Sequence, residues 1–334
     1  MTPVSQTKKP AWLKTRLPEG NKSREVKRIV SQYNLHTICS SGKCPNLGEC
    51  WGAGTATFLI LGDICTRSCR FCATKTGQPL PVDPDEPARV AASIKLMNLR
   101  HAVITSVDRD DLPDAGAMAW VATIREIRKV NSGTTIEALI PDFNGSRENL
   151  ERVMAEHPKL ISHNLETVRR LTPTIRSKAS YSRSLDVLEH IGANGIRTKS
   201  GIMVGLGETE EEVLELMDDL CQVRCSILTI GQYLQPTREH LPVQEYIHPD
   251  QFKQYRLAGL EKGFVHVESR PLVRSSYHAA RHVLYNVPRP GLDPISESLG
   301  IPGKTPSAGH YSKTPERKMF RIGTKESTGV VSFL

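Results

Sequence analysis

Six of the eight cysteines fall within 34 residues and form two sets of three. The first set has the spacing C-x4-C-x5-C and the second has C-x3-C-x2-C: Cys39, Cys44 and Cys50, then Cys65, Cys69 and Cys72. Three thiols cannot all pair as disulfides, and a chain of 334 residues can bury a core without such staples. Thiolates are soft ligands that select zinc, copper(I) or iron–sulfur clusters. The clustering therefore predicts metal binding in a reducing compartment.

Each set is one ligand short of the usual thiolate sites. Structural zinc takes four ligands, commonly in paired C-x2-C spacings, and a ferredoxin supplies four cysteines per cluster. A single zinc site built from both sets would leave two thiols over. Three thiolates on an iron–sulfur cluster leave one iron with an open position, which metal sites keep where a substrate or cofactor must bind. We therefore predict a docking position for a ligand, with a structural zinc or a buried thiol group as the alternative.

The second set directly follows an apolar, strand-like run. Such runs alternate with helix-like segments along the chain, and this alternation predicts a parallel sheet in a doubly wound or an incomplete barrel fold. The predicted strands are 57–61, 102–106, 135–140, 160–165, 198–204 and 226–231. The predicted helices are 86–99, 115–130, 146–156, 180–191 and 210–223.

Polar stretches follow each predicted strand. They comprise residues 65–72, 105–111, 141–145, 164–167, 205–208 and 232–236. In either fold, the carboxyl ends of parallel strands line the active face. We therefore expect the second cysteine set and these loops to surround one site.

The chain is expected to have three parts. Residues 1–56 carry the first cysteine set, residues 57–280 form the α/β body, and the proline-rich segment 281–334 is predicted to be loop-rich or disordered. The net charge of +8 is spread along the chain without a nucleic-acid-binding motif, so it indicates an acidic partner but no nucleic acid. No apolar stretch suits a signal peptide or a bilayer span. We expect a cytoplasmic protein with no membrane contact.

The C-x3-C-x2-C after a first strand resembles the signature of the radical S-adenosylmethionine (SAM) enzymes. That resemblance implies a partial (β/α)6 barrel with N- and C-terminal extensions. It also implies that Cys65, Cys69 and Cys72 hold a 4Fe–4S cluster whose open iron chelates the amino and carboxylate groups of SAM. An electron from the cluster would cleave the sulfonium to a 5′-deoxyadenosyl radical, and Phe71 would flank the adenine.

A narrower resemblance covers residues 11–279. The chain is similar to the lipoyl synthase family in "CSSGKCPNLGEC", "GDICTRSCRFC", "ITSVDRDDLPD", "EALIPDF", "KSGIMVGLGE", "ILTIGQYLQPT" and "VRSSYHA". The family inserts two sulfur atoms at carbons 6 and 8 of a protein-bound octanoyl chain on lysine. Other radical sulfur-inserting enzymes lack the first cysteine set paired with a C-terminal R-S-S-Y. The alternative from another class is a non-catalytic iron–sulfur carrier or a zinc module.

The resemblance also implies roles for individual residues. The first cysteine set would hold an auxiliary 4Fe–4S cluster that donates sulfur, with Ser276 of "RSSYH" as a weakly held fourth ligand. Without that set, Ser276 would be taken for part of a turn or a helix cap. The residues expected to contact SAM are Thr105, Ser106, Asn164, Glu166, Gly205 and Gly207. Asn164 as a helix cap and the two glycines as a simple turn are alternatives. We assign no catalytic acid–base pair, because a carbon radical abstracts the hydrogen.

The partners implied by the family are octanoylated lipoyl domains of 2-oxoacid dehydrogenase complexes or the glycine cleavage H protein. A reducing electron donor and a cluster-assembly carrier are implied too, and the basic charge suits an acidic lipoyl domain.

Two positions depart from the family pattern. Arg270 stands where glycine is usual, so it would strain a turn of positive φ, and Arg169 replaces a usual proline. Outside the two sets, Cys221 and Cys225 are predicted to be inert thiols, and His163 is expected to be a packed residue at a strand end.

Overall fold

A computed structural model describes residues 9–15, 20–53 and 55–284 of the chain. All the described elements belong to one unit, residues 1–287. All six predicted strands are present there: β2 (Thr57–Ile60), β5 (His101–Ser106), β6 (Thr135–Leu139), β7 (Leu160–Ser162), β8 (Thr198–Val204) and β9 (Ile227–Gln232). Residues 285–334, which hold nearly all of the predicted loop-rich segment, lie outside the described part.

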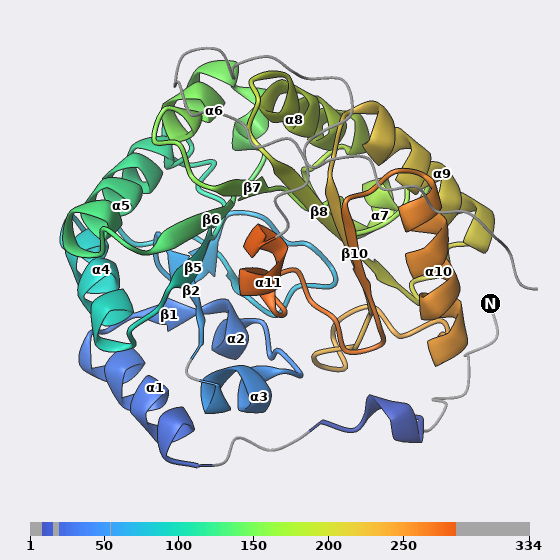
Figure 1. The fold of residues 1–334 in the computed structure, drawn as a ribbon, viewed down its shortest axis with the longest axis horizontal. Helices are drawn as coiled ribbons and strands as arrows, with labels where there is room; N and C mark the ends of the chain where they lie inside the picture. The colour runs from blue at the N-terminus through green and yellow to red at the C-terminus, as the bar shows by residue number, and fades with distance from the viewer. Residues whose placement is uncertain (1–8, 16–19, 54, 285–334) are drawn as a thin grey trace, which may run out of the picture. The chain divides into compact units, whose positions relative to one another are not determined.

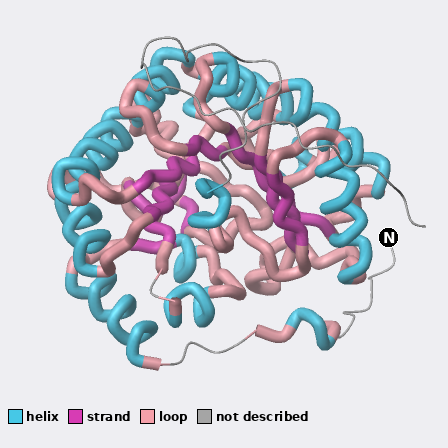
Figure 2. The backbone as a smooth tube through the Cα atoms, in the orientation of Figure 1, coloured by secondary structure: helices cyan, strands magenta, loops and turns pink. Residues whose placement is uncertain are grey.

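The main sheet of the described chain has eight strands in the order β1-β2-β5-β6-β7-β8-β9-β10. Strand β10 (His266–Ser269) adds a parallel strand that the sequence pattern did not predict, and β1 (His36–Thr37) pairs antiparallel with β2. The order follows the chain without reversal, as in a barrel and unlike a doubly wound sheet, where the strand order turns back. The fold is therefore the expected partial barrel (Figures 1 and 2).

The helices between the strands lie along the convex side of the curved sheet (Figure 1). They are α4 (Glu86–Leu96), α5 (Ala117–Val130), α6 (Arg147–Met154), α8 (Tyr181–Ala193), α9 (Glu210–Gln222) and α10 (Pro249–Glu261). Thr209 and Glu212 form a reciprocal capping box at the start of α9, which satisfies backbone N–H groups in its first turn. Helix α4 ends before the predicted residue 99 because Asn98 adopts a positive φ of 50°.

Shorter elements complete the described chain. Helices α1 (Asn21–Gln32), α2 (Ile38–Ser41) and α3 (Leu47–Gly52) precede β2, and the two-residue strands β3 (Ile64–Cys65) and β4 (Lys75–Thr76) form a separate pair. The 3-10 helices are η1 (Ala11–Leu13) and η2 (Phe143–Gly145), and α7 (Thr172–Ile175) follows β7. Helix α11 (Ala279–Leu284) lies on the concave side of the sheet and spans the predicted boundary between residues 280 and 281.

The core lies between the sheet and the outer helices. Trp120 of α5 and Ile104 of β5 are fully buried there, and every residue of β9 is buried. Strands buried on both faces read as continuous apolar runs, which is why the sequence pattern found most of them. No helix among the described residues is both long and apolar enough for a membrane span.

Candidate cofactor site

Both cysteine sets line one cavity of about 980 Å³. All six thiols line it, together with residues that follow β5, β7 and β9. In the parallel register, Ile60 of β2 pairs with Ser106 of β5, so neighbouring strands end at a common edge. Five of the six loops expected to surround one site therefore contribute to the cavity, whereas loop 205–208 does not, and the site also includes the first cysteine set.

The second set sits on the loop that follows β2. Cys65 closes the short strand β3, and its Sγ accepts N–H groups from Arg67 and Asp108, each at 3.4 Å. The Cys72 carbonyl oxygen lies 2.8 Å from Nε2 of His240. Burial raises the pKa of Cys65 to about 12 and that of Cys69 to about 11. These thiols therefore keep their protons near neutral pH unless a metal displaces them.

The first set comes from α2, α3 and the turn between them. Cys39 is buried in α2, and Cys50 lies in α3. Burial raises the pKa of Cys39 to about 11 and that of Cys50 to about 12, and repulsion between the neighbouring thiolates adds to both shifts. Cys39, Cys44 and Cys50 all line the same cavity.

The "RSSYH" segment packs against the first cysteine set. Nδ2 of Asn46 donates to the Leu272 carbonyl at 2.6 Å, and the Tyr277 hydroxyl donates to Oε1 of Glu49 at 3.0 Å. Nε2 of His278 lies 3.4 Å from the same oxygen. These contacts tie the two ends of the unit together, and Ser276 lines the cavity beside the cysteines.

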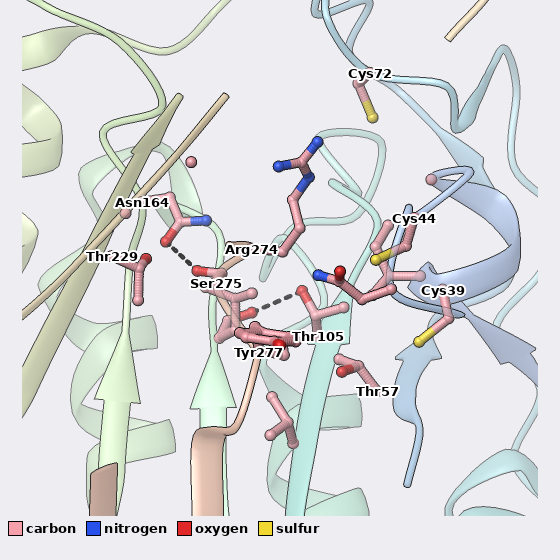
Figure 3. A pocket seen from close by; sticks show the side chains of 18 of the residues that line it. Cys39, Cys44, Thr57, Cys72, Thr105, Asn164, Thr229, Arg274, Ser275 and Tyr277 are labelled. Carbon is pink, nitrogen blue, oxygen red and sulfur yellow. Dashed lines mark hydrogen bonds between the residues drawn. The ribbon is translucent and has the colours of Figure 1, made fainter. Parts of the chain in front are cut away.

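Five of the seven residues predicted to contact SAM line the cavity: Phe71, Thr105, Ser106, Asn164 and Glu166. Asn164 accepts a hydrogen bond from the Ser275 hydroxyl at 2.7 Å and donates to Glu166 at 3.0 Å (Figure 3). Glu166 has a φ of +68°, a conformation that a non-glycine residue adopts rarely and that is concentrated at functional sites.

Gly205 and Gly207 are the two that do not line the cavity. Both have positive φ, which explains the residue type. A Cβ on Gly205 would come within 2.4 Å of the Glu245 carbonyl oxygen. The close approach predicted for this loop was to SAM, whereas the atoms nearest to such a Cβ belong to the Gln232 side chain and the Glu245 backbone of the same chain.

Sequence reasoning missed the arginines that line the cavity, among them Arg274 and Arg176. The Arg274 guanidinium points into the cavity between Asn164 and Cys44, toward Cys72 (Figure 3). Burial lowers its pKa, while the charges of Cys44 and Glu166 act in the opposite direction. Arg176 also lines the cavity and donates to the Leu165 carbonyl at 3.2 Å. Arg274 belongs to the R-S-S-Y motif, which was the available signal, whereas no local pattern singled out Arg176.

The remaining candidates lie as expected or without strain. Cys225 is buried in the core between β9 and α9, and Cys221 packs against the same cluster. Arg270 is not among the described residues that have a positive φ, so its turn does not require glycine. The exposed Arg169 stacks 4.4 Å from the Tyr181 ring centre.

The donor chemistry of both sets fits iron–sulfur clusters. Each set offers three sulfur atoms, which are the soft donors that iron–sulfur clusters take. The cavity is large enough to hold a nucleotide-sized ligand beside them. The Arg274 cation supplies positive charge where anionic clusters and a carboxylate would gather.

The barrel order and the three-cysteine loop define a radical SAM fold, and the radical SAM superfamily profile matches residues 59–220. The structure of SuiB from Streptococcus suis bound to precursor peptide SuiA shares this fold. Its TM-score is 0.51 at 10% sequence identity, over 74% of this chain and 52% of that chain. Membership in the superfamily makes the protein an enzyme that uses SAM and a 4Fe–4S cluster.

Curated relatives narrow the class further. A protein named lipoyl synthase from Bacteroides fragilis is 62% identical over 281 residues, which is 84% of this chain and 98% of the relative. One of the same name from Flavobacterium psychrophilum is 61% identical over 277 residues, which is 83% of this chain and 96% of the relative. The chain belongs to the lipoyl synthase family.

Proposed function

We propose that this protein inserts two sulfur atoms, at carbons 6 and 8, into an octanoyl chain carried on a lysine of a lipoyl-accepting protein. The observation that carries the proposal is the convergence of two three-cysteine sets and the "RSSYH" segment on one cavity. One set alone would serve only to activate SAM. A second set facing the same space supports a sulfur source within reach of the same substrate.

The two sets would have different roles. Cys65, Cys69 and Cys72 would hold the cluster that binds SAM. Cys39, Cys44, Cys50 and Ser276 would hold an auxiliary 4Fe–4S cluster. A serine oxygen is a harder and weaker iron ligand than a thiolate, so that corner would open first. When bound, the clusters and SAM together supply an electron, a carbon radical and sulfide, which no amino acid side chain can provide.

The chain's own residues orient the ligands and exclude water. Asn164 accepts from the Ser275 hydroxyl and donates to Glu166, and this pair would present one amide and one carboxylate to the amino and ribose groups of SAM. Thr105 and Ser106, the last two residues of β5, line the part of the cavity where the methionine part is expected. The Thr105 hydroxyl is held by the Leu139 carbonyl at 3.0 Å, so this wall of the cavity is rigid.

The proposed partners follow from the substrate. The octanoyl chain would arrive on a lipoyl domain of a 2-oxoacid dehydrogenase complex or on the glycine cleavage H protein. An electron donor would reduce the clusters, and a cluster carrier would rebuild the auxiliary one in the cytoplasm. The net charge of +8 suits an acidic protein substrate.

A turnover assay with an octanoyl-lysine peptide tests the proposal. After anaerobic reconstitution, we expect roughly eight irons per chain and a product heavier by two sulfur atoms, measured by mass spectrometry. The triple variant of Cys65, Cys69 and Cys72 to alanine should keep about half of the iron and form no product. Cys221→Ser, outside both sets, is the matched control and should behave as the unaltered chain. Bound zinc, or SAM that stays intact under reducing conditions, would overturn the proposal.

A further inference from the structure

The sulfur of Cys65 has a hydrogen-bonding environment supplied by a loop remote in sequence. Besides the Arg67 N–H, the Asp108 backbone N–H points at this sulfur at 3.4 Å. Asp108 follows β5, 43 residues along the chain. Hydrogen bonds to cluster sulfurs stabilise the added electron and so raise the reduction potential of an iron–sulfur cluster.

Thr66 holds that loop in place with both its backbone and its side chain. Its N–H and its hydroxyl each donate to the Asp108 carbonyl oxygen, at 3.1 and 3.0 Å. The same hydroxyl oxygen accepts the Asp110 N–H at 3.1 Å. The Thr66 side chain thus hydrogen-bonds to both neighbours of Arg109, Asp108 and Asp110. These bonds connect the loop after β5 to the loop that carries the second cysteine set.

A buried arginine reinforces the same contact. The Arg67 side chain is 3% exposed and lies 3.3 Å from the Asp108 carboxylate and 2.8 Å from that of Asp110. It also reaches Asp142 after β6 at 2.7 Å. The Asp108 carboxylate lies 3.7 Å from the Cys65 sulfur and shares the Arg67 cation with Asp110 and Asp142. The cation therefore offsets part of the negative charge beside this sulfur and fixes the loop that carries the Asp108 N–H.

We propose that Thr66 is a positioning residue that aims the Asp108 N–H at the Cys65 sulfur and thereby raises the reduction potential of the cluster held by the second cysteine set. The inference rests on the proposed role of Cys65 as a cluster ligand. It assigns Thr66 no contact with SAM or with the substrate. Its predicted effect is confined to one of the two clusters, because no described contact of Thr66 reaches the first cysteine set.

The test is a potentiometric titration of the reconstituted full-length enzyme, followed by electron paramagnetic resonance. The signal that changes on addition of SAM identifies the cluster of the second set. Thr66→Val has nearly the same shape but lacks the hydroxyl, so it should lower the potential of this cluster and leave the other unchanged. Thr66→Ser keeps the hydroxyl and should retain the original potential. Arg67→Lys, which weakens the same loop by another contact, should shift the potential in the same direction as Thr66→Val.

A second measurement addresses the hydrogen bond itself. After exchange into deuterated water, the Asp108 amide deuteron should couple magnetically to the reduced cluster, and this coupling should weaken in Thr66→Val. The reduction potential and the deuteron coupling are both measured on the clusters that form, so incomplete loading with iron does not hide either one. An unchanged potential in Thr66→Val, or an equal shift of both clusters, would overturn the inference. A failure of the proposed function would look different, because the unaltered chain would then show no SAM-responsive signal.

Discussion

His163 is held in one protonation state by the side chains and backbone around it. It is fully enclosed, with Nδ1 3.0 Å from the Ile140 carbonyl and Nε2 3.0 Å from the Ser184 hydroxyl. A carbonyl only accepts, so Nδ1 carries the proton and Nε2 accepts from Ser184. Arg176 donates to the same hydroxyl oxygen at 3.1 Å, which makes a second cation there unfavourable. His163 is thus the packed strand-end residue that the sequence indicated.

The stability of the fold should depend on pH through this histidine. Burial, followed by the Arg176 charge, lowers the pKa of His163 to about 4 from 6.5. Between these values the unfolded chain binds more protons, so stability should fall as the pH drops from 6.5 toward 4. The slope from this one group is at most about 1.4 kcal/mol per pH unit.

The measurement is the denaturant midpoint at pH 5, 6 and 7. His163→Gln should flatten the loss at low pH, whereas the exposed-site control His157→Asn should not. Equal pH dependence in the unaltered chain and in His163→Gln would contradict this role.

The strands on either side of β7 carry a charged pair inside the barrel. Glu137 of β6 and Lys199 of β8 are both fully buried, and their charged groups lie 2.5 Å apart. Lys199 also lies 3.3 Å from Nδ1 of His282 in α11. Each of the two charges needs a partner, because an ion buried without one would be costly. The Lys199–His282 contact joins helix α11, on the concave side, to the strands.

Strand β9 sets the position of the segment that presents Arg274 and Ser276. A Cβ on Gly231 would lie 2.0 Å from the Val273 carbonyl oxygen, a backbone atom that cannot move alone. Gly231→Ala should therefore displace this segment, reduce the iron held by the first cysteine set and lower stability by about 1–3 kcal/mol.

Iron per chain and the denaturant midpoint measure this effect. Gly133→Ala is the matched control, because a Cβ there has no neighbour within 4 Å. If Gly231→Ala bound iron and unfolded as the unaltered chain does, the close packing of this segment would have no consequence for the site.

Across the whole unit, the site is complete only when distant parts of the chain meet. The Asn46–Leu272 and Glu49–Tyr277 contacts join residues 226 and 228 positions apart. They bring Ser276 to the cavity that the cysteines of α2 and α3 line. A labile oxygen ligand supplied from the far end of the unit would allow the auxiliary cluster to open without unfolding either segment.

Ser276→Cys should impair sulfur release while leaving both clusters largely assembled, because a thiolate binds iron more strongly than a hydroxyl. Iron content should stay near that of the unaltered chain, while the doubly sulfurated product falls by at least about tenfold, or roughly 1.4 kcal/mol in barrier. Mass spectrometry of the peptide measures the loss. Ser132→Cys, on the exposed turn before β6, controls for an added thiol. A normal product yield from Ser276→Cys would count against Ser276 as the labile ligand.

The sequence by itself determined the six strands, the helices between them and the two cysteine sets. These depend on apolar periodicity, caps and short spacings, all of which act over a few residues. The sequence pattern did not predict strand β10, because "HVES" has only four residues and no apolar run.

Only the tertiary structure decided the placement of Arg176, the Glu137–Lys199 pair and the backbone partner of Gly205. It also decided that Arg270 needs no positive φ. Each of these depends on a residue far along the chain, since burial and electrostatic partners are set by which elements pack together. The local sequence pattern therefore cannot predict which of these residues meet.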